Sequence, residues 1–206
     1  EKGEIHCLLG ENGAGKTTLM NILFGLYKAD EGSLKINGED IVKHSAKKAF
    51  QCGLGMVHQH FMLVRPMTVL QNIILGMKVE SYPFIKKKDI AKKIKALSQK
   101  YGLAVDVDKR IDELSVGEQQ RVEILKALYR NAKLLVLDEP TAVLTPQETE
   151  VLFSVLRSLK EDGHSIILIS HRLAEIMEIT DKITVLRSGK RIDTLTTAKC
   201  TEALLS

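Results

Sequence analysis

A glycine-rich segment near the start of the chain has residue types and spacing suited to binding phosphate. Residues 10–17 fit the pattern Gly-x4-Gly-Lys-Thr, with Gly10, Gly15, Lys16 and Thr17 at the fixed positions. The glycines allow consecutive backbone N–H groups to turn toward phosphate oxygens, the lysine reaches the β- and γ-phosphates, and the threonine hydroxyl can bind Mg²⁺. The segment therefore predicts a nucleotide-binding loop.

Two adjacent acids, Asp138 and Glu139, follow the apolar residues 134–137. At the end of a buried strand, Asp138 would lie near a nucleotide-bound Mg²⁺, and Glu139 would be free to orient or deprotonate an attacking water. Acids at a strand end are ordinary loop residues in most proteins. The phosphate-binding loop earlier in the chain is what favours the nucleotide interpretation here.

Three further sites depend on their positions along the chain. Residues 114–121 read Leu-Ser-Val-Gly-Glu-Gln-Gln-Arg, in which Ser115 and Glu118 have the spacing of a capping box. Ser115 is thus predicted to begin a helix whose N-terminal N–H groups face an anion. Gln59 and His171 each follow a predicted strand, and neither would be informative by itself.

In combination, and in the order in which they occur along the chain, these five motifs resemble the ATPase subunit of an ATP-binding cassette (ABC) transporter, across essentially the whole chain. The resemblance implies an α/β fold with a P-loop NTPase (RecA-like) core, a mostly parallel sheet, a small antiparallel β piece and a helical subdomain. It implies a Walker A loop at residues 10–18, a Q-loop at Gln59, a signature at residues 114–118, a Walker B strand ending at Asp138 and a switch histidine at His171.

The resemblance also implies roles for individual residues. The residues implied to bind nucleotide are Gly10, Glu11, Asn12, Gly13, Ala14, Gly15, Lys16, Thr17, Thr18 and Gln59. Catalytic roles are implied for Glu139, His171 and Lys16, and Mg²⁺ ligation for Thr17, Gln59 and Asp138. The signature residues implied to act in trans, on ATP held by a facing cassette, are Ser115, Val116, Gly117 and Glu118.

The resemblance to this family also implies which partners the chain has. Two cassettes bind ATP between them, as a homodimer or a tandem pair, and drive transmembrane permease subunits, with a solute-binding protein involved only indirectly. The expected location is cytoplasmic, peripheral on the cytoplasmic face of the cell membrane. Residues 58–64 and 139–146 look most like the first cassette of the ATPases that serve simple-sugar and nucleoside importers.

The chain departs from the family pattern in three places. Val116 and Glu118 stand where Gly and Gln are commoner, and we expect Glu118 to fold back on its own helix cap. Thr145 stands where the family usually has Asp, although Thr145 with Glu148 forms another capping box that preserves the helix start. Only nine residues precede Gly10, so we expect truncation of the upstream segment that carries the adenine-stacking aromatic residue.

The elements that must position these residues follow from periodicity and turn signals. We expect strands at residues 5–9, 33–36, 55–58, 134–138, 165–169, 182–187 and 191–194, and helices at about 16–26, 44–51, 146–160 and 172–177. Residues 68–131 are almost entirely helical in pattern. We therefore expect one domain over residues 1–206, with a core formed by 1–67 and 132–206 and a helical subdomain at about 68–131.

Composition limits the alternatives. The 206 residues carry 30 basic and 26 acidic side chains, and 44% are apolar, which favours a folded globular domain. No apolar run approaches the roughly 20 residues of a membrane-spanning helix. Three widely spaced cysteines are interpreted as small buried hydrophobes in a reducing compartment.

The basic side chains are concentrated in one segment. Residues 78–110 hold ten Lys and Arg against four acids, a local charge of +6. We interpret this segment as a solvated helix face. The next interpretation is a surface that meets a membrane-associated partner, and nucleic acid comes last because stacking aromatics are few. Two alternatives remain open, namely a soluble ABC ATPase that acts on nucleic acid or the ribosome and a cassette that binds ATP without hydrolysing it.

Overall fold

The computed structural model describes residues 2–36, 38–41, 45–77 and 87–200 of the 206-residue chain. The strands are β1 Ile5–Leu9, β2 Lys35–Ile36, β3 Glu39–Asp40, β4 Leu54–Val57, β5 Leu134–Asp138, β6 Ser165–Ile169, β7 Lys182–Arg187 and β8 Lys190–Thr196. The helices are α1 Lys16–Leu23, α2 Ala46–Gln51, α3 Val69–Ile74, α4 Lys87–Tyr101, α5 Val116–Tyr129, α6 Pro146–Glu161 and α7 Leu173–Ile179, with 3₁₀ turns η1 Ile111–Glu113 and η2 Thr197–Lys199.

Six strands form one sheet in the order β4-β5-β6-β1-β7-β8, and β2 pairs with β3 in a separate hairpin. All neighbours in the large sheet are parallel except β7 and β8. Parallel strands need crossover connections, and the helices that supply them cover the sheet. The predicted fold class, a mostly parallel α/β sheet with a small antiparallel piece, is confirmed.

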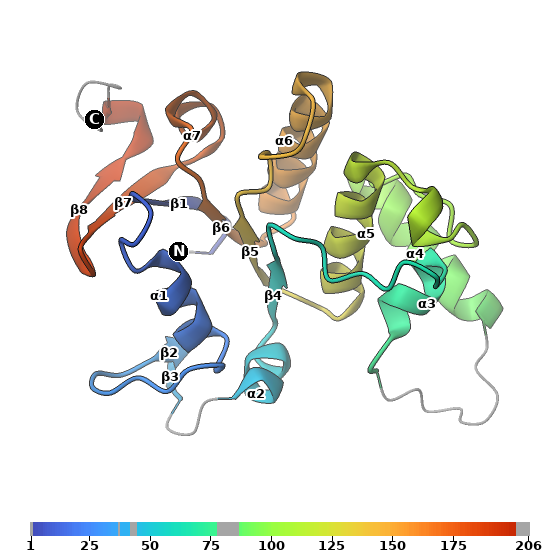
Figure 1. Ribbon diagram of the computed structural model, residues 1–206, viewed down its shortest axis with the longest axis horizontal. Helices are drawn as coiled ribbons and strands as arrows, with labels where there is room; N and C mark the ends of the chain where they lie inside the picture. The colour runs from blue at the N-terminus through green and yellow to red at the C-terminus, as the bar shows by residue number, and fades with distance from the viewer. Residues whose placement is uncertain (1, 37, 42–44, 78–86, 201–206) are drawn as a thin grey trace.

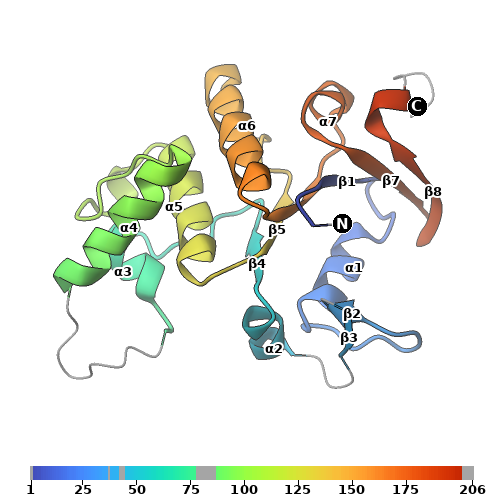
Figure 2. The same ribbon diagram turned by 180° about the vertical axis from the view of Figure 1, so that it is seen from behind.

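Alternating side chains of the central strands divide the core into two layers. On β5, Leu135 and Leu137 pack with residues of α3, α4, α5 and α6, whereas Val136 between them packs with residues of α1 and α2. This is the period-two alternation of a strand buried on both faces. Figures 1 and 2 show the result, with α6 on one side of β5 and α1 with α2 on the other.

Helix α1 differs from its predicted extent. The helix ends at Leu23, so Leu26, at the end of the predicted helix, lies beyond it and is 59% exposed. Met20 and Phe24, four residues apart, make the buried contact instead, and Leu19 is 44% exposed. Residues four apart share a helix face, and the face with Met20 is the one turned to the sheet.

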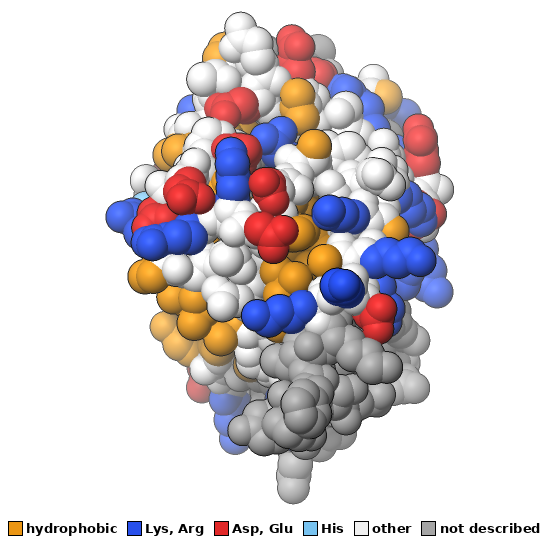
Figure 3. Space-filling view, turned by 90° about the vertical axis from the view of Figure 1, so that its right-hand side faces the viewer, with side chains coloured by type: hydrophobic (Ala, Val, Ile, Leu, Met, Phe, Trp, Pro, Cys, Tyr) orange, Lys and Arg blue, Asp and Glu red, His pale blue; other side chains and the backbone are white. Residues whose placement is uncertain are grey.

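The helices α3, α4 and α5 pack against one another to one side of the sheet (Figure 1). On α4, Ile90, Ile94 and Tyr101 are buried, while its lysine side chains are exposed. Lys and Arg side chains are accordingly spread over this side of the molecule in Figure 3. Of the basic segment, Lys78 and Lys86 lie outside the described residues.

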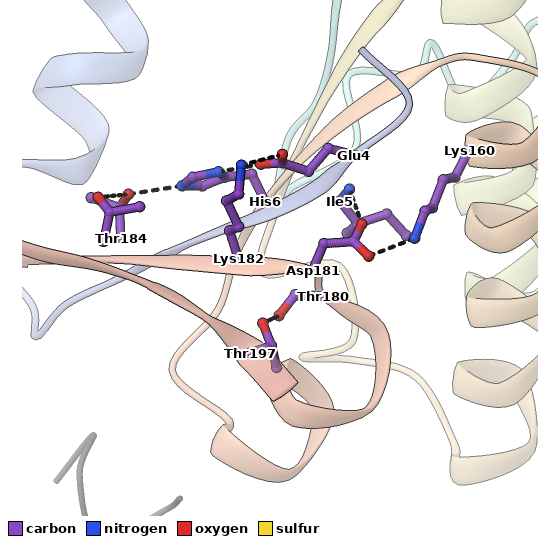
Figure 4. Close-up of polar contacts among 10 residues, drawn as sticks. Glu4, Ile5, His6, Lys160, Thr180, Asp181, Lys182, Thr184 and Thr197 are labelled. Carbon is purple, nitrogen blue, oxygen red and sulfur yellow. Dashed lines mark hydrogen bonds and ion pairs between the residues drawn. The ribbon is translucent and has the colours of Figure 1, made fainter. Parts of the chain in front are cut away.

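Polar contacts fasten the start of β1, the strand that leads into the glycine-rich loop (Figure 4). The Ile5 N–H donates to Asp181 Oδ2 at 2.9 Å, and Lys182 Nζ lies 2.9 Å from Glu4 Oε2. His6 Nδ1 lies 2.8 Å from the other oxygen of Glu4. These contacts tie β1 to the beginning of β7 and so fix the direction in which β1 enters the loop.

None of the helices within the described ranges combines the length and apolar character that crossing a bilayer requires.

Candidate functional site

The glycine-rich loop between β1 and α1 is closed around its own lysine. Lys16 Nζ donates to the backbone oxygens of Gly10, at 2.6 Å, and Glu11, at 2.9 Å, and the Lys16 side chain is buried. Gly13 and Gly15 have φ angles of 82° and 95°, in the left-handed region that favours glycine. The loop thus has the backbone conformation and the cation that phosphate binding requires.

The first turn of α1 presents unpaired donors to the same space. Gly15 is the N-cap and supplies no side-chain cap, and the first turn carries no acidic residue. Thr17 and Thr18 are exposed there. A helix N-terminus with open N–H groups and no competing carboxylate favours an anion.

Asp138 ends β5 at the carboxyl edge of the sheet, the edge where β1 runs into the glycine-rich loop. Burial raises the pKa of the Asp138 carboxyl, and the negative charge of Glu139 raises it further, while the charges of His58 and Lys16 act in the opposite direction. Two neighbouring carboxylates in a half-buried place favour binding of a cation, because a cation relieves their repulsion.

Glu139 brings together two residues that are far apart in the sequence. Gln59 Nε2 donates to Glu139 Oε2 at 3.3 Å, and His171 Nδ1 lies 3.0 Å from Glu139 Oε1. Glu139 has a φ angle of 44°, rare for a residue with a side chain, and its N–H donates to Ile169 O at 2.9 Å. The chain therefore turns sharply at the strand end while continuing the ladder with β6, and the carboxylate stands at that turn between Gln59 and His171.

The segment that follows Gln59 is attached to the helices. Asn72 on α3 is 1% exposed, and its side chain accepts from the Val64 N–H at 2.7 Å and donates to the Val64 carbonyl at 3.1 Å. Lys126 on α5 donates to the Met62 carbonyl at 3.0 Å. Residues 62–64 are therefore attached to α3 and α5, whereas Gln59 contacts Glu139 at the sheet edge.

The predicted signature forms the N-terminus of α5. Ser115 Oγ accepts from the Glu118 N–H at 3.2 Å, and Glu118 Oε2 accepts from the Ser115 N–H at 2.8 Å, so the predicted capping box and the fold-back of Glu118 are confirmed. Gln120 donates to Pro140 O at 2.7 Å, which anchors α5 to the loop after β5.

Within the described ranges, no hydrogen bond or ion pair joins residues 115–118 to the glycine-rich loop. In Figures 1 and 2, α5 and α1 lie on different sides of the sheet. One chain alone therefore brings Gln59, Asp138, Glu139 and His171 to the sheet edge and leaves the predicted signature apart from the glycine-rich loop.

Several contacts at this edge were not predicted from the sequence. The buried Thr141 donates with Oγ1 to Glu175 Oε2 at 2.5 Å, and Arg172 donates to Glu175 Oε1 at 2.9 Å. These contacts link the loop after Glu139 to the start of α7, next to His171. The only local signal is the i, i+3 spacing of Arg172 and Glu175 on a helix.

Groups of three or more His, Cys, Asp and Glu side chains suited to a metal do not occur among the described residues. Of the three residues predicted to bind Mg²⁺, Thr17 lies in the first turn of α1, Asp138 ends β5 within reach of the charge of Lys16, and Gln59 contacts Glu139. Mg²⁺ in nucleotide sites is commonly held by one or two protein oxygens together with substrate phosphates. The donor set therefore fits Mg²⁺ that arrives with a nucleotide.

Comparison with known proteins agrees with this geometry. The family model described as "ABC transporter" matches residues 1–142. The nucleoside import ATP-binding protein NupA of Lactococcus lactis is 55% identical over 195 residues, covering 95% of this chain and 38% of the relative. The guanosine import ATP-binding protein NupO of Bacillus subtilis is 52% identical, with coverages of 95% and 38%. A ribose import ATP-binding protein of Bacillus licheniformis is 45% identical, with coverages of 94% and 40%.

Solved structures show the same fold. A nucleotide-free ATP-binding cassette from an ABC transporter superposes with a TM-score of 0.84 at 28% identity, covering 95% of this chain and 81% of the other. A dimeric cassette in a post-hydrolysis state, bound to ADP and phosphate, gives 0.80 at 25% identity, with coverages of 96% and 87%. The chain spans about two fifths of the length of the curated relatives it matches.

Proposed function

This chain belongs to the ABC transporter family, and we propose that it binds ATP against a second cassette and hydrolyses it to energise solute import. The arrangement around Glu139 carries the proposal. Gln59 contacts one oxygen of the Glu139 carboxylate and His171 contacts the other, directly after the end of β5. That arrangement suits the positioning of a water for attack on a phosphoryl group.

The nucleotide would bind at the glycine-rich loop. Phosphate oxygens would receive N–H groups of residues 10–18, and Lys16 would exchange its bonds to Gly10 and Glu11 for bonds to the β- and γ-phosphates. Mg²⁺ held by Thr17, Gln59 and Asp138 would neutralise phosphate charge. Gln59 fits this role because its Nε2 is used by Glu139, which leaves its amide oxygen as the metal-binding end.

Glu139 is proposed as the catalytic base or water-orienting group, with His171 as the γ-phosphate sensor beside it. His171 is 62% exposed on its side chain while Glu139 is 19% exposed. The histidine can therefore contact an incoming phosphate, while the carboxylate is kept in one orientation. Thr141, Arg172 and Glu175 position the backbone on either side of this pair.

A second cassette is proposed to complete the site. The N-terminus of α5, with Ser115, Val116, Gly117 and Glu118, is separated from the phosphate-binding loop of its own chain (Figure 1). A contact with ATP held by a facing chain would use those N–H groups as an anion site. The dimeric cassette structure that resembles this chain supports such a pair.

The permease contact is proposed at a groove of about 270 Å³ between α2 and α5. Leu26, Phe50 and Met62 line it and are 59%, 47% and 66% exposed, an apolar surface suited to a partner helix. Lys126, which also lines the groove, binds the Met62 carbonyl three residues after Gln59. A partner seated there would be mechanically connected to the hydrolysis site, and the chain would work at the cytoplasmic face of the membrane.

The solute is proposed to be a nucleoside or a simple sugar. The names of the relatives with 55% and 52% identity specify nucleoside and guanosine import, and the names of two relatives at 45% specify ribose import. Selectivity would belong to the permease and to the solute-binding protein, which this chain would meet only indirectly. The relatives favour import over the nucleic-acid and non-hydrolysing alternatives.

The test is MgATP hydrolysis by the chain as a function of its own concentration. We expect the specific rate to rise with concentration, because two chains share each site. Glu139→Gln should lower the rate by at least about 100-fold and leave the dissociation constant for ATP unchanged. Glu161→Gln, the same charge change on an exposed helix end, should leave both unchanged. Loss of ATP binding in Glu139→Gln would contradict the role assigned to Glu139.

A further inference from the structure

The N-termini of two helices meet outside the hydrolysis site. Helices α5 and α6 approach each other around a small cavity of about 150 Å³. Its polar side chains are Gln120 and Arg121, in the second turn of α5, and Gln147 and Glu148, in the first turn of α6, and Gly117 lines it from the first turn of α5. Both ends carry N–H groups that no helical carbonyl can satisfy.

The two oxygens of the Glu148 carboxylate are divided between the two helices. Oε2 accepts from the Thr145 N–H at 3.0 Å and from the Thr145 hydroxyl at 3.1 Å, which caps α6 itself. Oε1 faces Gly117. A methyl group added to Gly117 would overlap Oε1 and lie 2.9 Å from Cδ and 3.2 Å from Cγ of Glu148.

The cap of α5 leaves this position open for Glu148. Ser115 Oγ takes the Glu118 N–H, and Ser115 O takes the Gln119 N–H. The N–H group of Gly117, which lies between Ser115 and Glu118 in the sequence, takes part in neither of these hydrogen bonds. The Glu148 carboxylate therefore lies beside a backbone donor that the capping box does not use.

Electrostatics favours an ionised carboxylate at this place. Hydrogen bonding by the Thr145 backbone lowers the pKa of Glu148 most, and the Thr145 hydroxyl, the Gly117 backbone and the positive charge of Arg121 lower it further. The positive ends of two helix dipoles also converge there. A negative charge thus lies against the helix end that the proposed function assigns to a phosphate.

We propose that Glu148 is a positioning residue of the signature: its carboxylate holds the Gly117 end of α5 against α6 and is displaced when the γ-phosphate of ATP on a second cassette arrives. The inference rests on the proposed function, because the arriving phosphate belongs to the facing chain. Glu148 then acts as an intramolecular competitor for the anion site, and its charge sets how much ATP is needed to close the dimer.

Glu148→Gln separates charge from structure. Gln has the same shape and still completes a capping box with Thr145, so α6 keeps its start. Because Thr145 uses the single amide oxygen, the NH2 group of the new side chain faces Gly117, cannot accept from its N–H and carries no charge to oppose a phosphate. Glu150→Gln is the matched control, because Glu150 lies on the same helix with its side chain exposed.

The contact itself is tested without nucleotide by following the Gly117 amide proton by NMR during an acid titration. We expect the amide resonance to move with a midpoint below 4.5, the ordinary value for Glu, and the movement to vanish in Glu148→Gln but persist in Glu150→Gln. A Gly117 resonance that ignores the titration, or that titrates equally in Glu148→Gln, overturns the inference.

The displacement step is tested by ATP-dependent dimerisation in a Glu139→Gln background, measured by sedimentation. Glu148→Gln should lower the half-saturating ATP concentration about threefold, with no change for Glu150→Gln and none in ATP binding by the monomer. An unchanged or higher ATP requirement overturns the displacement step. If no variant dimerises, the proposed function fails and the displacement step with it, while the amide titration still decides the contact.

Discussion

Asn72→Ala should loosen the segment that connects Gln59 to the helices. The Asn72 side chain is 1% exposed and bonds to both backbone groups of Val64, at 2.7 and 3.1 Å, and to the carbonyls of Met67 and Thr68, at 3.4 and 3.0 Å. Alanine removes all four contacts and keeps the helix, since its helix propensity is higher than that of asparagine.

The size of the effect follows from those contacts. Each intramolecular hydrogen bond contributes about 1 kcal/mol net, and the 3.4 Å contact is weak. Val64 is 37% exposed, so water can replace part of what is lost at its backbone. We therefore expect a loss of about 2 to 3 kcal/mol in the free energy of unfolding, or a melting temperature lower by roughly 5 to 10 °C for a chain of this size.

The assay is urea denaturation, combined with hydrogen exchange of residues 58–67. Gln99→Ala, which removes an amide from an exposed position on α4, is the control and should change stability by less than about 0.5 kcal/mol. ATP hydrolysis by Asn72→Ala should fall because the segment after Gln59 loses its attachment to α3 and keeps the one from Lys126 on α5. A loss below about 1 kcal/mol with unchanged exchange in residues 58–67 would refute the reasoning.

Two further predictions concern titrating groups. Hydrogen bonds from Lys100 and then Tyr101 lower the pKa of Asp162 from 3.8 to about 2, so the contact stabilises the fold above about pH 4 and this contribution is lost as the pH falls toward 2. Asp162→Asn should flatten the acid loss of stability in that window, measured by urea midpoints, and an unchanged slope would contradict this. Burial raises the pKa of Cys7 to about 12, so a thiol reagent at pH 8 should modify the half-buried Cys52 first and Cys7 only after unfolding. Peptide mapping by mass spectrometry gives the two rates, and similar rates would show that Cys7 is accessible.

The features predicted from sequence are those with local signals. The start of α5 at Ser115 and of α6 at Thr145 were predicted because a cap and its partner are three residues apart, and both capping boxes are present. The apolar run that forms β5 identified a strand buried on both faces. The fold class followed from the alternation of such strands with helices.

What the sequence did not predict depends on contacts between distant segments. Asn72 looks like an ordinary polar residue of α3, and nothing in its neighbourhood indicates that it is buried against Val64. The left-handed backbone of Glu139 has no signal in its residue type. The approach of Glu148 to Gly117 requires the packing of α6 on α5, which no single-sequence period can specify. The prediction of buried cysteines is confirmed for Cys7 and Cys200, whereas Cys52 is only half-buried.

The lysine folded into the glycine-rich loop affects how variants of this loop must be interpreted. Lys16 Nζ bridges the carbonyls of Gly10 and Glu11, so the side chain acts as an internal brace that keeps two backbone dipoles aligned. Lys16→Ala would remove both this brace and the charge that we propose binds phosphate. A loss of ATP binding in Lys16→Ala would therefore combine weakened electrostatics with a relaxed loop, whereas Glu139→Gln leaves the brace intact and is the cleaner inactive reference.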